Sequence, residues 1–123
     1  MITPQELRIG NFVHSPYDGH VIKINPADIF LMANGHHREA RFEPIELTEE
    51  WLLKFGLETD NEVDEIDGVM FKLYHLEDYI IEYWIRDNKF KFTDDCALEV
   101  FVSSVHQLQN LNLALTGEEL TIK

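Results

Sequence analysis

Hydrophobic and polar residues alternate along the second half of the chain with the period of β-strands. Turn-forming residues separate four such segments: Val69–His75, Tyr79–Arg86, Lys89–Thr93 and Ala97–Val102. In the third segment both phenylalanines fall on one face and both lysines on the other. The pattern predicts an antiparallel meander of three or four strands, with Asp87-Asn88 as a two-residue hairpin turn.

The pattern then changes to the helical period over Ser103–Gly117. Ser104 and Gln107 have the spacing of a capping box, and Gly117 stands where a helix ends in a left-handed residue. Four apolar residues fall on one arc of this helix, namely Val105, Leu108, Leu111 and Leu115. We expect this arc to pack on the meander, because an amphipathic helix needs an apolar partner.

The opposite side of this helix carries His106, Gln109, Asn110 and Leu113. One interpretation is a solvated, amide-rich face with one exposed leucine. A second is a contact with a partner or another subunit, anchored by Leu113. A catalytic His106 is the weakest interpretation, because the sequence brings no nucleophile or carboxylate beside it.

Short strands with tight turns dominate the N-terminal half. Thr3-Pro4-Gln5-Glu6 has the residues of a short opening helical turn. Strands are expected over Phe12–His14, His20–Asn25, Ile29–Ala33 and His36–Phe42, with turns at Asp18-Gly19 and Asn34-Gly35. With Asp18-Gly19 as the whole turn, His14 would lie opposite Lys23. Such strands suggest a small SH3-like barrel or a strongly bent sheet.

A second helix begins at Thr48, with Glu49 and Glu50 in its first turn, and ends at Gly56, before the apolar Leu57. Residues 1–47 then form the barrel-like half, and residues 48–123 contain this helix, the meander and the C-terminal helix. We expect one α+β domain of 123 residues, mostly antiparallel β, with the meander covered by the C-terminal helix.

Three segments resemble a known protein family. They are Ile2–Asn11 (ITPQELRIGN), Phe42–Gly56 (which contains PIELTEEWLLKFG) and Val105–Leu120 (VHQLQNLNLALTGEEL). In this order they resemble a family of small uncharacterised proteins from Bacteroides-type gut bacteria, their phages and mobile elements. The resemblance implies a phage or mobile-element origin and carries over no catalytic residue. The family often has an aromatic pair where this chain has Asn112 and Leu113, so no stacking role carries over to them.

The net charge and the cysteine content disfavour several classes of function and location. The formal net charge is −13, and residues 48–123 hold seventeen of the 23 acids. Such a charge repels phosphate backbones and anionic membrane surfaces, which disfavours nucleic-acid and membrane binding. The longest apolar run, Ile29–Ala33, is far shorter than a membrane span. A single cysteine, Cys96, excludes an internal disulfide and favours a cytoplasmic location.

Candidate sites for ions are weak. The acidic run Glu58–Asp67 lacks the glycine that an EF-hand loop needs, so we expect a solvated loop; a loose cation site and an acidic docking surface are the alternatives. His36 and His37 would point to opposite faces of a strand and cannot easily share a metal ion. No metal or other cofactor is expected. The motifs of common enzyme classes are absent, and Cys96 with His106 is the one thiol–imidazole combination.

The preferred hypothesis is a non-enzymatic accessory protein of a phage or mobile element that acts through protein–protein contact. The contact surface would be the acidic C-terminal half or the helix face around Leu113. A more specific form of this hypothesis is an acidic protein whose carboxylates mimic phosphates and that occupies a nucleic-acid-binding host protein. The alternative is a small module that binds a ligand or nucleic acid on the barrel, with Arg38, Arg41, Tyr17 and Phe42 as its platform. The partner and the oligomeric state do not follow from the sequence.

Overall fold

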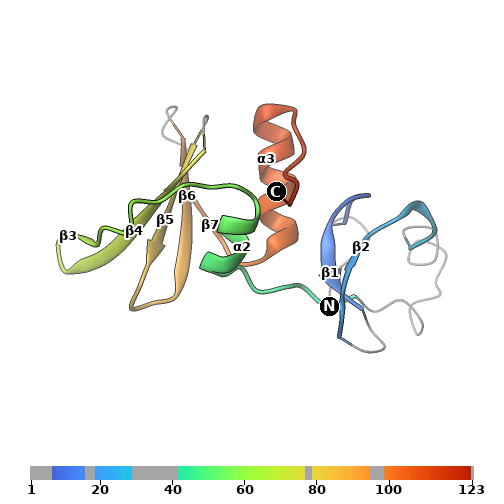
Figure 1. The fold of residues 1–123 in the computed structure, drawn as a ribbon, viewed down its shortest axis with the longest axis horizontal. Coiled ribbons are helices and arrows are strands. Elements are labelled where there is room, and N and C mark those ends of the chain that lie inside the picture. The colour runs from blue at the N-terminus through green and yellow to red at the C-terminus, as the bar shows by residue number, and fades with distance from the viewer. Residues whose placement is uncertain (1–6, 16–18, 29–41, 77–78, 95–98, 123) are drawn as a thin grey trace. The chain divides into compact units, whose positions relative to one another are not determined.

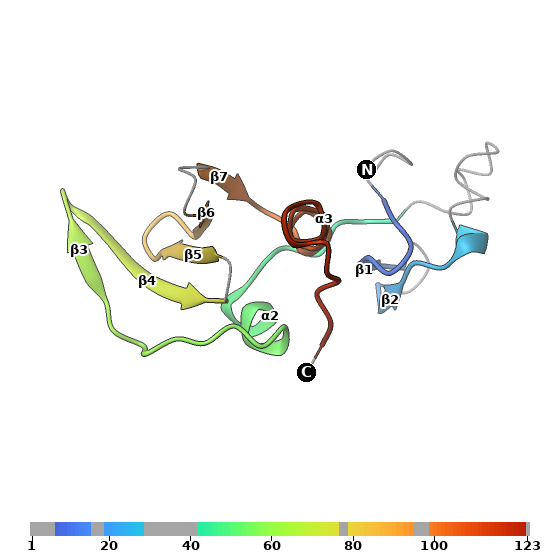
Figure 2. The ribbon, with the colours of Figure 1, turned by 90° about the horizontal axis from the view of Figure 1, so that it is seen from above.

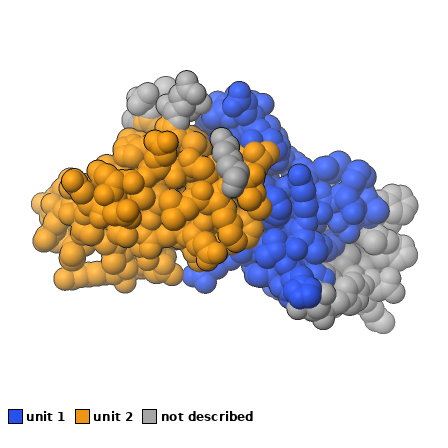
Figure 3. All heavy atoms as spheres, in the orientation of Figure 1, with its two compact units in different colours: residues 1–46, 104–119 blue, residues 47–103, 120–123 orange. Residues whose placement is uncertain are grey.

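The computed structural model describes residues 7–15, 19–28, 42–76, 79–94 and 99–122, which form an α+β fold (Figure 1). The strands form two antiparallel sheets, one of two strands and one of five. The chain divides into two compact units (Figure 3). Unit 1 contains residues 1–46 and 104–119, and unit 2 contains residues 47–103 and 120–123. The expected α+β class and the antiparallel strands are confirmed.

Unit 1 contains the two-stranded sheet. Strands β1 (Phe12–His14) and β2 (Val21–Lys23) pair antiparallel, with His14 opposite Val21. The Ser15 N–H donates to the carbonyl of His20 at 2.7 Å, so the chain already turns between these two residues. The predicted pairing of His14 with Lys23 is therefore wrong, because the connection is longer than the Asp18-Gly19 turn alone.

Part of the core of unit 1 lies at β1 and β2. Leu7, Val13, Ile24 and Phe42 form one buried cluster, and β1 also exchanges backbone hydrogen bonds with Glu43. The described residues form no closed barrel, so the SH3-like barrel is not confirmed. The predicted opening turn at residues 3–6 and the second hairpin at residues 29–41 lie outside the described residues.

Helix α3 (Val105–Thr116) also belongs to unit 1, where it contacts β1. It starts after Ser104 and ends at Gly117, whose φ of 74° is the predicted left-handed end. The Ser104 side chain makes no capping hydrogen bond, so that detail of the predicted capping box is wrong. The sequence had placed this helix in the C-terminal half, and its packing on the meander stays a prediction.

Unit 2 contains the meander. Its strands are β3 (Asp64–Ile66), β4 (Val69–His75), β5 (Tyr79–Trp84), β6 (Lys89–Asp94) and β7 (Glu99–Val102). They neighbour one another in chain order, as Figure 2 shows, so the predicted meander is confirmed. Phe90 and Phe92 are buried, and the lysines of β6 lie on the other face, as the alternation predicted.

Two connections in this sheet differ from the predictions. Trp84 pairs with Lys89, so residues 85–88 all belong to the loop, and the two-residue Asp87-Asn88 turn is wrong. Part of the acidic run is also a strand, β3, which was expected to be loop. Asp67 and Gly68 have φ of 50° and 82°, which a two-residue hairpin turn requires at both positions. An Asp-Gly pair between apolar residues is the sequence signal that could have revealed β3.

Helix α2 (Glu49–Lys54) has the predicted ends. The Thr48 hydroxyl accepts a hydrogen bond from the N–H of Trp51 at 3.3 Å. Gly56 has a φ of 88°, and the Leu57 N–H donates to the Leu52 carbonyl at 3.1 Å, which completes a Schellman motif. Neither α2 nor α3, the helices with given bounds in the described residues, is long and apolar enough to cross a membrane.

Candidate functional site

The polar side of α3 is turned into unit 1. The side chain of Gln109 is fully buried; its Nε2 donates to the Gly10 carbonyl at 3.0 Å, and its Oε1 accepts from the Phe12 N–H at 2.8 Å. Buried backbone groups need hydrogen-bond partners, and the amide side chain supplies one donor and one acceptor at once. Gln109 therefore joins the helix to the segment that leads into β1.

A second amide extends this connection. Asn110 Oδ1 accepts from Arg8 Nε and from Asn11 Nδ2, each at 2.9 Å. The guanidinium of Arg8 also binds Glu119 beyond the helix, at 2.7 Å. Asn11 is fully buried, and the network around it joins residues near both ends of the chain.

These contacts correct the expected faces of the helix. His106 is 2% exposed and Gln109 is buried, so the interpretation as a solvated face is wrong. Leu113 is half-buried, whereas Leu115, which was expected in the core, is 46% exposed. The reason is that the partner segment offers backbone polar groups, and amides satisfy these where leucine cannot.

The structure describes only some of the other candidate residues identified from the sequence. Ser104 Oγ lies 3.2 Å from His106 Nδ1, and both residues are buried. Arg38, Arg41 and Cys96 lie outside the described residues. The ligand- or nucleic-acid-binding alternative therefore stays a prediction.

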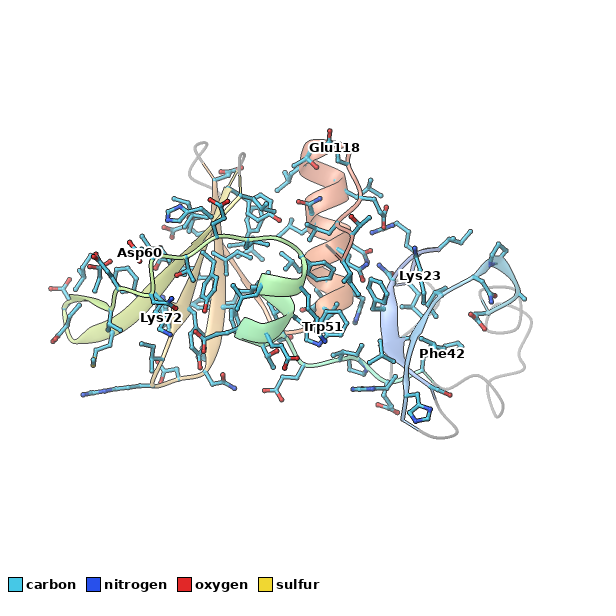
Figure 4. The ribbon with its side chains drawn as sticks, in the orientation of Figure 1. Lys23, Phe42, Trp51, Asp60, Lys72 and Glu118 are labelled. Carbon is cyan, nitrogen blue, oxygen red and sulfur yellow. The ribbon has the colours of Figure 1, made fainter. Side chains whose placement is uncertain are left out.

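The acidic run is exposed along residues 60–68. Asp60, labelled in Figure 4, accepts a hydrogen bond from the backbone N–H of Glu62 at 2.9 Å. Among the residues that the structure describes, no group of three or more His, Cys, Asp or Glu side chains could hold a metal ion.

A polar cluster ties α2 to the inner side of the meander. The Tyr74 hydroxyl donates to Glu49 Oε1. The Nζ of Lys72, which Figure 4 labels, lies 3.1 Å from the same oxygen. Burial, and then the hydrogen bond to Glu49 and its charge, raise the pKa of the Tyr74 hydroxyl well above its usual range. The cluster therefore favours a neutral tyrosine beside a carboxylate.

This cluster predicts a loss of stability in alkaline solution. In the unfolded chain the Tyr74 hydroxyl ionises near pH ~10, whereas the folded protein keeps the proton to higher pH. The stabilising contribution is present below pH ~10 and is lost as pH rises toward the folded pKa, at up to about 1.4 kcal/mol per pH unit. Tyr74→Phe should therefore lose stability less steeply than the wild type between pH ~9.5 and ~11. Urea midpoints against pH test this, and parallel curves for the two proteins would contradict it.

The opposite side of the five-stranded sheet carries an apolar surface. We call it the outer face; it contains the side chains that point away from Lys72 and Tyr74. From the strand register, its apolar members are Ile66, Val69, Phe71, Leu73, Ile80, Trp84 and Phe101. Its charged members are Asp64, Glu82, Lys89, Lys91 and Glu99.

Two aromatic rings on the outer face are held in place. Trp84 and Phe101 meet edge to face, with ring centroids 5.1 Å apart. Trp84 Nε1 donates to Glu82 at 3.2 Å, and Lys91 Nζ lies 5.7 Å from the centroid of the Trp84 ring. Phe101 is nevertheless 53% exposed and Ile66 is 62% exposed. The outer face therefore presents ordered apolar groups to solvent at Phe101 and Ile66, whereas Phe71 on the same face is only 8% exposed.

Sequence reasoning did not identify the outer face. A clue was present in Tyr79–Trp84, where apolar residues occupy both alternating sets of positions and not one alone. A strand with one solvated face ordinarily has polar residues on that face. The excess of apolar residues indicated a second apolar surface in addition to the core.

Comparison of the chain with protein-family models, with curated proteins and with solved structures finds no match.

Proposed function

We propose that this chain is a non-enzymatic accessory protein that acts by binding a protein through the outer face. The supporting observation is an aromatic pair at the surface: Phe101 is 53% exposed, and its partly buried neighbour Trp84 is held by Glu82 and Lys91. Contiguous exposed apolar groups mark contact sites more reliably than scattered ones. Aromatic residues are also enriched in the cores of protein interfaces, because rigid rings lose little entropy on binding.

Sequence features support the same class of function. The net charge of −13 opposes binding of nucleic acid, and the residues form none of the common catalytic motifs. The segment resemblance makes a phage or mobile-element origin part of the proposal, and the single cysteine makes a cytoplasmic location part of it. Gln109 and Asn110, which were candidates on the helix, already bind the segment before β1, so the outer face is the preferred surface.

Site-directed photocrosslinking tests the proposal. A photoreactive phenylalanine analogue is placed at Phe101, and, as a matched control, at Leu115, which is similarly exposed at 46% on α3. Crosslinking is carried out in host lysate at low and moderate salt, with Phe101→Asp and Leu115→Asp proteins as competitors. We expect a defined protein adduct at position 101 that excess Leu115→Asp protein suppresses and excess Phe101→Asp protein does not.

The adduct can contain another protein or a second copy of the chain, and either supports protein binding by the outer face. Adducts at position 115 alone, or no adduct at position 101 at either salt concentration, would overturn the proposal. Equal competition by the two variants would also overturn it, because binding would then be independent of the outer face.

A further inference from the structure

We infer that the partner of the outer face is a second copy of this chain, related by a two-fold axis parallel to the strands. The inference rests on the proposed use of the outer face and names its occupant. The order of charged and aromatic side chains across the sheet supports it. A second copy turned by the two-fold axis presents this order in reverse, so that opposite charges and aromatic positions face one another.

One row of side chains crosses the outer face from β3 to β6. Asp64 is opposite Phe71, Phe71 is opposite Trp84, and Trp84 is opposite Lys89. The row therefore reads acid, aromatic, aromatic, base. Adjacent strands lie about 4.8 Å apart, so the acid and the base are separated by roughly 14 Å.

A two-fold axis along the strands, between β4 and β5, reverses this row. It lays β3 of one copy over β6 of the second and β4 over β5. Asp64 then meets Lys89 of the second copy, and Trp84 of each copy lies over the position of Phe71, whose own side chain is 8% exposed. Each contact occurs twice, as isologous interfaces require, and the aromatic centre is flanked by two opposite-charge pairs.

The neighbouring row strengthens the charge pattern. It contains Lys91, which lies opposite both Glu82 and Phe101 in the register. Both lysines of the outer face therefore lie on β6. Lys91 is paired with Glu99 of β7 at 3.3 Å, so Lys89 is the lysine that faces Asp64 of a second copy. The opposite edge strand, β3, is part of the acidic run and carries Asp64 on the outer face. A partner with one sign of charge would fit only one of these edges, whereas a second copy fits both.

The area of the outer face determines how tightly the proposed dimer is expected to form. Four strands span roughly 19 Å, and the longest of them, β4, has 7 residues and is roughly 24 Å long, so the flat area of about 450 Å² is smaller than the ~800 Å² per partner of standard stable interfaces. The net charge of −13 also opposes association, although this repulsion is screened over about 8 Å at physiological salt. We therefore expect a reversible dimer in the micromolar range.

Sedimentation velocity of the full chain at concentrations from about 1 to 200 µM, in ~0.15 M NaCl, tests the inference. The wild type should shift from monomer to dimer across this range. Asp64→Lys and Lys89→Asp should each weaken dimerisation at least about tenfold, because each places like charges in contact. The double variant Asp64→Lys/Lys89→Asp restores opposite charges and the original net charge, so it should recover dimerisation.

Glu118→Lys serves as the control, because it makes the same change of net charge as Asp64→Lys in unit 1. It should leave the dimer intact or strengthen it slightly. A wild type that stays monomeric at the highest concentration would overturn the second copy as partner. A dimer whose strength depends only on net charge, with no recovery in the double variant, would do the same. If crosslinking at Phe101 then gives an adduct with another protein, the proposed function stands and the self-association fails.

Discussion

Replacing Gln109 by leucine should lower the free energy of unfolding of unit 1 by about 2–5 kcal/mol. The leucine fills a similar volume but cannot form the two hydrogen bonds that the Gln109 side chain makes with Gly10 and Phe12. Gln109 and Gly10 are buried, so water does not replace the partner that the Gly10 carbonyl loses, whereas Phe12 is partly exposed and its loss is smaller. Each buried backbone group that loses its partner costs roughly 1–3 kcal/mol.

Amide hydrogen exchange combined with urea denaturation measures this effect. In the Gln109→Leu protein the Phe12 amide should exchange faster, and the unfolding transition that helix α3 reports should move to lower urea. Gln107→Leu is the matched control, because it changes the same residue type on the same helix at an exposed position. Equal losses of stability in the two variants would show that the buried amide contacts contribute nothing specific.

Replacing Phe92 by alanine should destabilise unit 2 by about 3–5 kcal/mol. Phe92 is fully buried on the inner side of the meander, and its ring lies against Tyr79, with centroids 4.3 Å apart. Removing the ring loses its transfer free energy and leaves a cavity that the sheet fills only in part. Trp51 on α2 and Trp84 on β5 provide fluorescence signals within the same unit.

Phe101→Ala separates core packing from the outer face. It removes the same ring from the next strand, where the side chain is 53% exposed. At sub-micromolar protein concentration, where the proposed dimer is dissociated, it should cost less than about 1 kcal/mol. Comparable costs for the two alanine variants would mean that the inner and outer faces do not differ in burial as the structure indicates.

The predictions that held depend on short stretches of chain. Thr48 caps α2 through the N–H three residues later, and Gly56 adopts the left-handed conformation that ends it. The alternation of Phe90 and Phe92 with the lysines of β6 likewise assigned the inner and outer faces of that strand. In each case the interacting residues lie within a few positions of one another in the chain, so the local sequence is sufficient to predict the interaction.

The predictions that failed depend on the length of a connection or on a distant partner. His14 pairs with Val21 and Trp84 with Lys89, because each hairpin loop is longer than its two strongest turn residues. The polar face of α3 was expected in solvent for a different reason. Its partner, the backbone around Gly10, lies about a hundred residues away in the chain and leaves no periodic signal beside the helix.

The sequence by itself determined the antiparallel meander, the two helices α2 and α3 and the acidic character of the chain, since these follow from residue spacing and composition. Only the tertiary structure decided which side of α3 is buried. It also decided that the strands of unit 2 leave an aromatic outer face exposed. Whether a side chain is buried depends on which other segments pack against it. Gln109 is buried because the backbone groups of Gly10 and Phe12 form hydrogen bonds with its side chain. Periodicity describes one element at a time, whereas burial is a property of the elements together.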